Sequence, residues 1–165
     1  MAALVASGSA ELPDGVILTE THGGPHGNAY SDVGVVKPGQ VVKAITVRSG
    51  KRVNGVGLTI EGLPEPVYHG GHGGSKDTRT LAKGEIVTSM EVHWDEQHSH
   101  TRVFFINFTT NFNNSIFGGT PMIDSSLIAK DTADDGYQLG GFSGYAGKEL
   151  DSVAALWTRI NADDK

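Results

Sequence analysis

A short stretch near the end of the chain, Gly147-Lys148-Glu149-Leu150-Asp151, carries residues suited to binding a hydroxyl-rich ligand. Gly147 gives the backbone freedom to turn, so that main-chain N–H groups can point outward. Asp151 adds two acceptor oxygens beside those donors. Because each sugar hydroxyl both donates and accepts hydrogen bonds, such a convergence suits a carbohydrate. The same residues also fit a plain hairpin turn with a solvated aspartate, and the stretch alone leaves both interpretations open.

The flanking residues predict that this stretch joins two strands. Gly140, Gly141 and Gly144 precede it, and Val153, Ala155 and Trp157 alternate with other residues after it. Alternation with a period of two is typical of a strand. We therefore expect a tight loop between two strands, with the Asp151 carboxylate at the exit of the loop.

Composition predicts one all-β domain. A chain of 165 residues is long enough for a single domain with a real core. Glycine accounts for 23 residues, about 14%, which is twice the usual share of about 7%. The glycines lie in pairs between apolar, β-branched runs, which is typical of many short strands joined by tight turns. No stretch carries a sustained helical period.

Charge and cysteine content exclude several classes of function. The net charge of −6 disfavours a nucleic-acid or anionic-membrane partner. The absence of cysteine excludes disulfides, thiol catalysis and cysteine metal sites. No stretch approaches the roughly 18 apolar residues of a membrane span.

Three segments are expected along the chain. Residues 1–15 are predicted to be a linker or a remnant of the expression vector, residues 16–160 the domain, and residues 161–165 a frayed tail. The first ten residues lack a basic region and have only a short apolar part, so they give no clear signal peptide. Secreted and cytoplasmic locations both stay open. The predicted strands are 16–18, 33–36, 41–48, 53–60, 86–94, 101–108, 127–129 and a final hairpin from residue 137.

Internal repetition organises these strands. Two glycine loops, residues 21–28 and 69–75, place Gly27 and Gly74 47 positions apart (74 − 27), and a third glycine pair follows at Gly118. The turns at residues 50–54 and 147–151 share one pattern of Gly, Lys, a charged residue, an aliphatic residue and Asx. The middle hairpin, with its turn at residues 95–100, lacks it. Three four-stranded antiparallel units that pack on a common axis would form a three-sided prism.

The sequence resembles the jacalin-related lectins. The likeness rests on His-Gly-Gly-His-Gly-Gly-Ser at residues 69–75, and on the run at residues 140–151 that ends in a Gly-x-x-x-Asp signature. It covers residues 16–160. The resemblance implies an all-β, β-prism I fold, in which three four-stranded antiparallel Greek-key sheets are related by pseudo-threefold symmetry.

The family also implies a sugar site without a metal, a cofactor or bond cleavage. Backbone N–H groups of Lys148 and Glu149, in the loop that begins at Gly147, would donate to sugar oxygens. The Asp151 carboxylate would accept from two adjacent hydroxyls. The N–H of Gly27 would close the site from the first glycine loop. In that loop Asn28 stands in place of the last glycine of a strict alignment, and an offset of one makes Gly27 the contact residue.

A weaker second site is expected at the first hairpin. Its residues would be Gly50, Lys51, Arg52, Asn54 and Gly74. Asn54 stands where the family has aspartate, and an amide cannot copy two carboxylate acceptors. We therefore expect this site to be weak or inactive. The middle repeat has no such signature, and no site is expected there.

The resemblance favours mannose- or glucose-containing glycans or glycoproteins as partners. Galactose-preferring relatives are proteolytically split and surround the site with aromatic residues, whereas this chain looks unprocessed and has Lys148 and Glu149 beside Gly147. Tyr145 is the nearest candidate for a stacking ring. A homodimer is compatible with the sequence.

Other functions remain as alternatives. The loop histidines, His22, His26, His69 and His72, raise the question of a metal site, but no cysteine or carboxylate lies in the same loops, so solvated loops are the simpler expectation. A glycosidase would need a carboxylate pair such as Asp134-Asp135 or Glu149 with Asp151. The remaining alternatives are a β-prism interaction module that has lost sugar binding and the targeting domain of a larger protein.

Overall fold

The computed structural model describes residues 12–123 and 127–162, and this part of the chain forms thirteen β-strands and no helix. Most of residues 1–15, and the last three of the predicted tail, lie outside the described residues. The strands are β1 (Val16–Leu18), β2 (His22–Gly23), β3 (Asn28–Ser31), β4 (Val42–Ser49), β5 (Val53–Ile60), β6 (Val67–Gly70), β7 (Ser75–Thr80), β8 (Val87–Gln97), β9 (His100–Thr110), β10 (Ser115–Gly119), β11 (Ile128–Thr132), β12 (Tyr137–Ala146) and β13 (Leu150–Arg159).

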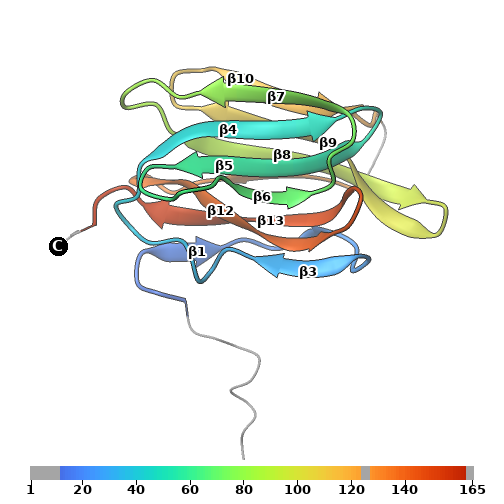
Figure 1. The fold of residues 1–165 in the computed structure, drawn as a ribbon, viewed down its shortest axis with the longest axis horizontal. Coiled ribbons are helices and arrows are strands. Elements are labelled where there is room, and N and C mark those ends of the chain that lie inside the picture. The colour runs from blue at the N-terminus through green and yellow to red at the C-terminus, as the bar shows by residue number, and fades with distance from the viewer. Residues whose placement is uncertain (1–11, 124–126, 163–165) are drawn as a thin grey trace, which may run out of the picture.

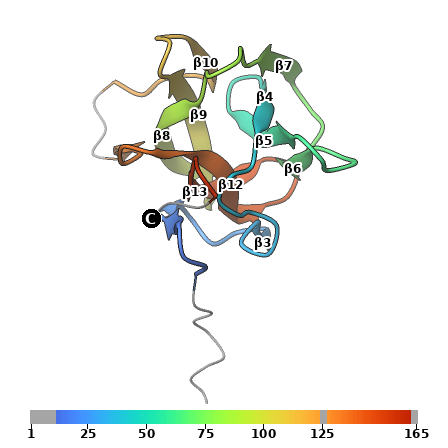
Figure 2. The same ribbon diagram turned by 90° about the vertical axis from the view of Figure 1, so that its left-hand side faces the viewer.

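Three antiparallel sheets surround a common axis (Figure 2). The first sheet has the order β1-β13-β12-β3, and β2 also pairs with β13. The second has the order β6-β5-β4-β7, and the third has the order β10-β9-β8-β11. The first sheet therefore joins the beginning of the chain to its end (Figure 1). This arrangement confirms the predicted all-β prism of three sheets.

Each sheet turns one face of its long hairpin toward the shared core. In β4, Ile45 and Val47 are buried while Lys43 is exposed. A register shift between Val42 and Ala44 interrupts the simple period of two at this point. Phe108 of the third sheet packs edge-on against Phe142 of the first, with ring centroids 5.9 Å apart. Burial of each such side chain stabilises the fold by about 1.5–3 kcal/mol.

The structure corrects several predicted elements. Residues 33–36 form a turn, not a strand, because the N–H groups of Val35 and Val36 both donate to the carbonyl of Asp32. Strands β7 and β10 were not predicted from the sequence because both are edge strands, of which β7 is polar and β10 contains glycine. The middle hairpin is also longer than expected. At the tip its strands also include residues 95–97 and residue 100, and only residues 98–99 form the turn.

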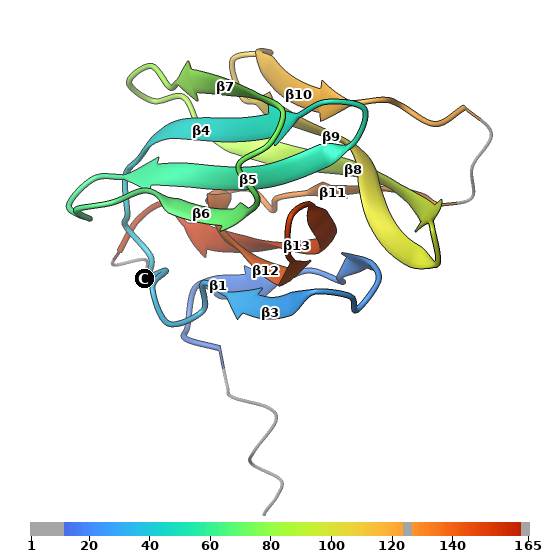
Figure 3. The ribbon, with the colours of Figure 1, turned by 45° about the vertical axis from the view of Figure 1, so that its right-hand side comes forward.

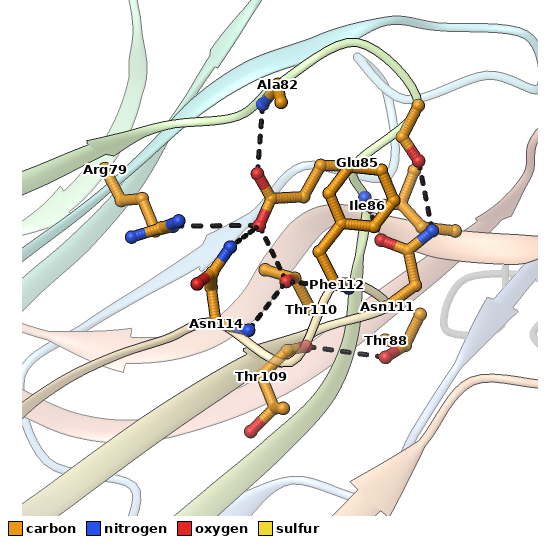
Figure 4. A network of polar contacts seen from close by, with 11 residues as sticks. Arg79, Ala82, Glu85, Ile86, Thr88, Thr109, Thr110, Asn111, Phe112 and Asn114 are labelled. Carbon is orange, nitrogen blue, oxygen red and sulfur yellow. Dashed lines mark hydrogen bonds and ion pairs between the residues drawn. The ribbon is translucent and has the colours of Figure 1, made fainter.

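Glu85, in the turn before β8, is a buried carboxylate, and Figure 4 shows its polar contacts. Glu85 accepts hydrogen bonds from the N–H of Ala82 (3.0 Å), the hydroxyl of Thr110 (2.7 Å) and the amide of Asn114 (2.8 Å). These hydrogen bonds, assisted by Arg79, lower the pKa of Glu85 from 4.5 to about 2. The network joins the turn before β8 to the turn after β9.

Histidine–carboxylate pairs close two of the seams between sheets. His69 on β6 lies 2.7 Å from Asp32, next to β3, and its ring stacks on Tyr30. His22 on β2 lies 2.9 Å from Asp131 on β11. In the part of the chain that the structure describes, there is no helix long and apolar enough to cross a membrane.

Candidate functional site

The turn between β12 and β13 presents backbone donors at the surface. The N–H of Gly147 donates to the carbonyl of Glu149 (2.9 Å), which closes the turn. Within residues 12–123 and 127–162, the N–H groups of Lys148 and Glu149 have no protein acceptor. Gly147 and Lys148 are exposed. The turn therefore presents these two N–H groups without a protein acceptor, and their use by a sugar stays a prediction.

The structure brings Gly27 directly against Asp151. Gly27 has a φ of 89°, and a Cβ at this position would lie 2.5 Å from Oδ2 of Asp151 and 2.7 Å from the carbonyl oxygen of Ala146. Any other residue would be strained and would also collide with both groups. The first glycine loop is anchored beside them, because the N–H of Gly24 donates to the backbone carbonyl of Asp151.

The Asp151 carboxylate is covered, in contrast to the solvated aspartate that one interpretation of the sequence allowed. Asp151 is 2% exposed, and its Oδ1 accepts a hydrogen bond from Nη1 of Arg102 on β9. Burial raises the pKa of Asp151 above its ordinary value of 3.8, while the positive charge of Arg102 acts in the opposite direction. Arg102 is therefore the counter-ion of the carboxylate.

Glu149 is also paired with an arginine. Arg52, from the turn between β4 and β5, donates from Nε (2.7 Å) and Nη2 (2.9 Å) to the two carboxylate oxygens of Glu149. These bonds lower the pKa of Glu149. Nε of Arg102 lies 3.6 Å from the same carboxylate. Two carboxylates of the first sheet and one arginine from each of the other two sheets thus form a single ion network.

The β8–β9 hairpin reaches the site because it projects beyond the other two hairpins (Figures 1 and 3). At its tip, the N–H of Thr101 donates to Nδ1 of His26 (3.3 Å), and the rings of His26 and His100 lie 4.4 Å apart. A Cβ at Gly24 would lie 2.4 Å from Cβ of Thr101. The middle repeat has no signature of its own, yet it packs on the first glycine loop and supplies Arg102.

Sequence reasoning missed Arg102 for a physical reason. Arg102 lies 49 positions from Asp151, and an isolated arginine after a polar turn belongs to no sugar-binding pattern. Only the length of the hairpin and the angle between two sheets bring the two side chains together.

The residues of the predicted second site repeat the geometry of the first. A Cβ at Gly74, whose φ is 72°, would lie 2.5 Å from Oδ1 of Asn54 and 2.5 Å from the carbonyl oxygen of Ser49. The N–H of Gly50 donates to the carbonyl of Arg52 (2.9 Å), as Gly147 does to Glu149. Gly74 therefore occupies, at the second site, the position that Gly27 occupies at the first. A cavity of about 220 Å³ is lined by Gly50, Lys51, Arg52, Asn54, Gly74 and Glu149.

The four loop histidines are held apart by separate partners. His22 and His69 bind carboxylates in two different seams, His26 lies against His100, and His72 stacks on Tyr68. Among the described residues, no group of three or more histidine, aspartate or glutamate side chains is arranged to hold a metal ion.

Comparisons with known proteins agree with this architecture. Residues 19–156 match the model of the Jacalin-like lectin domain. The chain is 32% identical over 139 residues to Secreted RxLR effector protein 19 of Plasmopara viticola, covering 82% of this chain and 77% of that protein.

Solved lectin structures share the fold. The structure of wild-type Malaysian banana lectin superimposes with a TM-score of 0.73 and 22% identity, covering 88% of this chain and 99% of the lectin. AcmJRL, a mannose-binding jacalin-related lectin from Ananas comosus, superimposes with a TM-score of 0.71 and 15% identity over the same shares. Together with the sheet topology and the repeated Gly–Asx corners, the family match shows that this chain belongs to the Jacalin-like lectin domains, a carbohydrate-binding family.

Proposed function

We propose that the chain binds a neutral sugar at the corner formed by Gly27, the turn at residues 147–149 and Asp151. One observation carries the proposal: the buried carboxylate of Asp151 lies directly behind Gly27 and beside the free N–H groups of Lys148 and Glu149. Once Arg102 moves aside, two donors and a carboxylate would be presented to one ligand, which matches the alternating donors and acceptors of a sugar diol.

Sugar binding requires the Arg102 side chain to move away from the Asp151 carboxylate that it covers. The Asp151 side chain is 3% exposed and that of Arg102 is 24% exposed, so the arginine is the more accessible partner. A carboxylate has about four acceptor positions. Arg102 can therefore rotate outward, keep its contact with Glu149 and still leave positions on Asp151 for two hydroxyls. In this role Arg102 keeps the buried carboxylate ionised until the ligand arrives.

We further propose mannose- or glucose-type glycans as ligands. The resemblance of the unprocessed chain to mannose/glucose-binding lectins supports this preference, and so does the mannose binding stated for AcmJRL. Binding proceeds without bond cleavage, because Glu149 and Asp151, the carboxylates at the corner, are each held in an ion pair and lack the free acid and base of a glycosidase. The secretion stated for the Plasmopara viticola relative supports a secreted protein.

Titration calorimetry with mannose, glucose and galactose tests the proposal. We expect binding of mannose or glucose with weaker or no binding of galactose, and the same affinity after chelator treatment. Absence of binding to all three sugars by the folded protein would overturn the proposed function.

A protein-interaction module is the second candidate, favoured by the covered carboxylate and by the effector relative. It predicts that a broad glycan array gives no binding even for Arg102→Gln, in which the cover is shortened. Binding on the array by either form excludes it.

A further inference from the structure

A second feature of the molecule lies outside the predicted site, on the outer face of the second sheet. Two glycines, Gly55 and Gly57, occupy consecutive outward positions of the central strand β5, where side chains would otherwise fill the face. Tyr68 of β6 lies over them, since a Cβ at Gly55 would meet its hydroxyl oxygen. The result is a groove of about 270 Å³ with Tyr68 at its side.

The other side of the groove is cationic. Arg48 on β4 and Lys76 on β7 are directly opposite each other in the strand register, and both line the groove. Like charges at directly opposed positions of an antiparallel pair destabilise the sheet. A bound anion would remove this repulsion. The positive pair is more notable because the chain has a net charge of −6.

Aromatic rings complete the groove. His72 stacks on Tyr68 with ring centroids 5.6 Å apart and planes 17° apart. Two hydrogen bonds hold the stacked rings in place. The Tyr68 hydroxyl donates to the carbonyl of Gly71 (2.5 Å), and Nη1 of Arg48 donates to the carbonyl of His72 (3.1 Å). A fixed aromatic surface with one polar end suits a ring that is apolar on its face and polar at its edge, as a pyranose is.

The groove adjoins the corner proposed for neutral sugar. The second glycine loop separates the two, and a Cβ at Gly71 would lie 2.1 Å from the carbonyl oxygen of Lys148. Another cavity, of about 280 Å³, is lined by Gly147 at one side and by Tyr68 and Gly70 at the other. A chain of sugars that leaves the corner at Gly147 therefore meets Tyr68 next.

From this arrangement we propose that the groove between Tyr68 and the Arg48–Lys76 pair is a subsite for an acidic sugar residue, a hexuronate, within a longer glycan. The inference rests on the proposed function, because the neutral end of the same glycan occupies the corner at Asp151. The sugar ring packs on Tyr68 and His72, and its carboxylate lies between Arg48 and Lys76. Glu65, at the groove as well, repels the carboxylate and so directs it toward the two cations.

The test compares β-1,4-linked mannotriose with an acidic trisaccharide, the same compound with mannuronate in place of one terminal mannose, so that the two differ only at C6 of that residue. Calorimetry is performed on the wild type, on Arg48→Gln/Lys76→Gln and on a control, Lys83→Gln/Lys130→Gln, which removes the same charge from two lysines elsewhere. Removal of the opposed charges relieves repulsion, so the groove variant should fold.

We expect the wild type to bind the acidic trisaccharide at least fivefold more tightly than mannotriose, a preference that shrinks with added salt. The groove variant should lose the preference and keep its affinity for mannotriose, whereas the control should keep both. Amide shifts induced by the acidic trisaccharide should include Thr46, Gly57 and Tyr68. A preference that is absent, or that survives in the groove variant, overturns the subsite while mannotriose binding upholds the proposed function. If the wild type binds neither trisaccharide, both fail.

Discussion

Replacement of Asp151 by asparagine is the most direct test of the sugar corner. The two side chains have the same shape, so the change removes a charge and one acceptor oxygen while it keeps the volume behind Gly27. The protein itself provides the comparison, because Asn54 occupies the equivalent position against Gly74. The substitution therefore converts the first corner into a chemical copy of the second.

The magnitude follows from the hydrogen bonds at stake. A hydrogen bond to a charged group contributes about 1.5–3 kcal/mol, and the amide retains one of the two acceptors. A loss of that size weakens binding about 10- to 100-fold. Stability should change little. On balance the pKa of Asp151 is raised, so the ionised carboxylate is less favourable in the fold than in water. Arg102 also keeps Glu149 at 3.6 Å. We expect the free energy of unfolding to change by no more than about 1 kcal/mol, which is a shift of about 2–4 °C in melting temperature.

The assay is calorimetric titration of mannose and glucose against Asp151→Asn, with thermal denaturation of the same samples. The matched control is Asp135→Asn, which removes the same charge from an exposed residue of the turn before β12. The control should bind like the wild type. A well-folded Asp151→Asn protein with the wild-type affinity would falsify the assignment of Asp151 to the site. A variant that unfolds would contradict the stability argument, and Asp151→Ser, which also removes the charge, would then be titrated instead.

Further predictions concern the same corner, its copy and the buried glutamate. Asn54→Asp should create or strengthen binding at the second corner, raising the calorimetric stoichiometry toward two sugars per chain; a stoichiometry that stays unchanged at saturating sugar would contradict the equivalence of the corners. Sugar affinity of the wild type should fall as the pH is lowered through the raised pKa of Asp151, because the protonated carboxyl loses its charge. The midpoint of this fall should lie above the ordinary value of 3.8. A midpoint at or below that value, in a titration across acidic and neutral pH, would count against a role of the Asp151 carboxylate in binding. Arg102→Gln should bind sugar at least as well as the wild type at mildly alkaline pH, since the Asp151 carboxylate is less covered. On acidification the variant should lose binding at a higher pH than the wild type does, because the counter-ion of Asp151 is gone. Identical pH profiles would show that Arg102 does not act on the site. The pKa of Glu85 is lowered from 4.5 to about 2, so its ionised form stabilises the fold above pH 4.5, and this contribution is lost as the pH falls toward 2. Glu85→Gln should therefore lower the melting temperature at neutral pH, by a difference from the wild type that shrinks on acidification. A difference that stays constant with pH would refute the linkage.

Much of the fold could be predicted from local patterns. The apolar, β-branched runs, the tight turns and the spacing of the glycine loops specify hairpins, because each depends on residues close in the chain. Strands β7 and β10 lacked that pattern because edge strands bury little. Their place is decided by hydrogen bonds to β4 and β9, which belong to the neighbouring hairpins of their own sheets.

For the candidate site, the sequence by itself determined the turn at residues 147–151 and the Asx difference between the two corners, since glycine and aspartate chemistry is local. Gly27 was a candidate through the resemblance to the lectin family. Only the tertiary structure decided that Asp151 is buried and that arginines from the other two sheets neutralise Glu149 and Asp151. Those contacts depend on how far the β8–β9 hairpin projects and on how three sheets meet around one axis. No short motif predicts either property, because both arise from the packing of segments that lie 49 and 97 positions apart in the sequence.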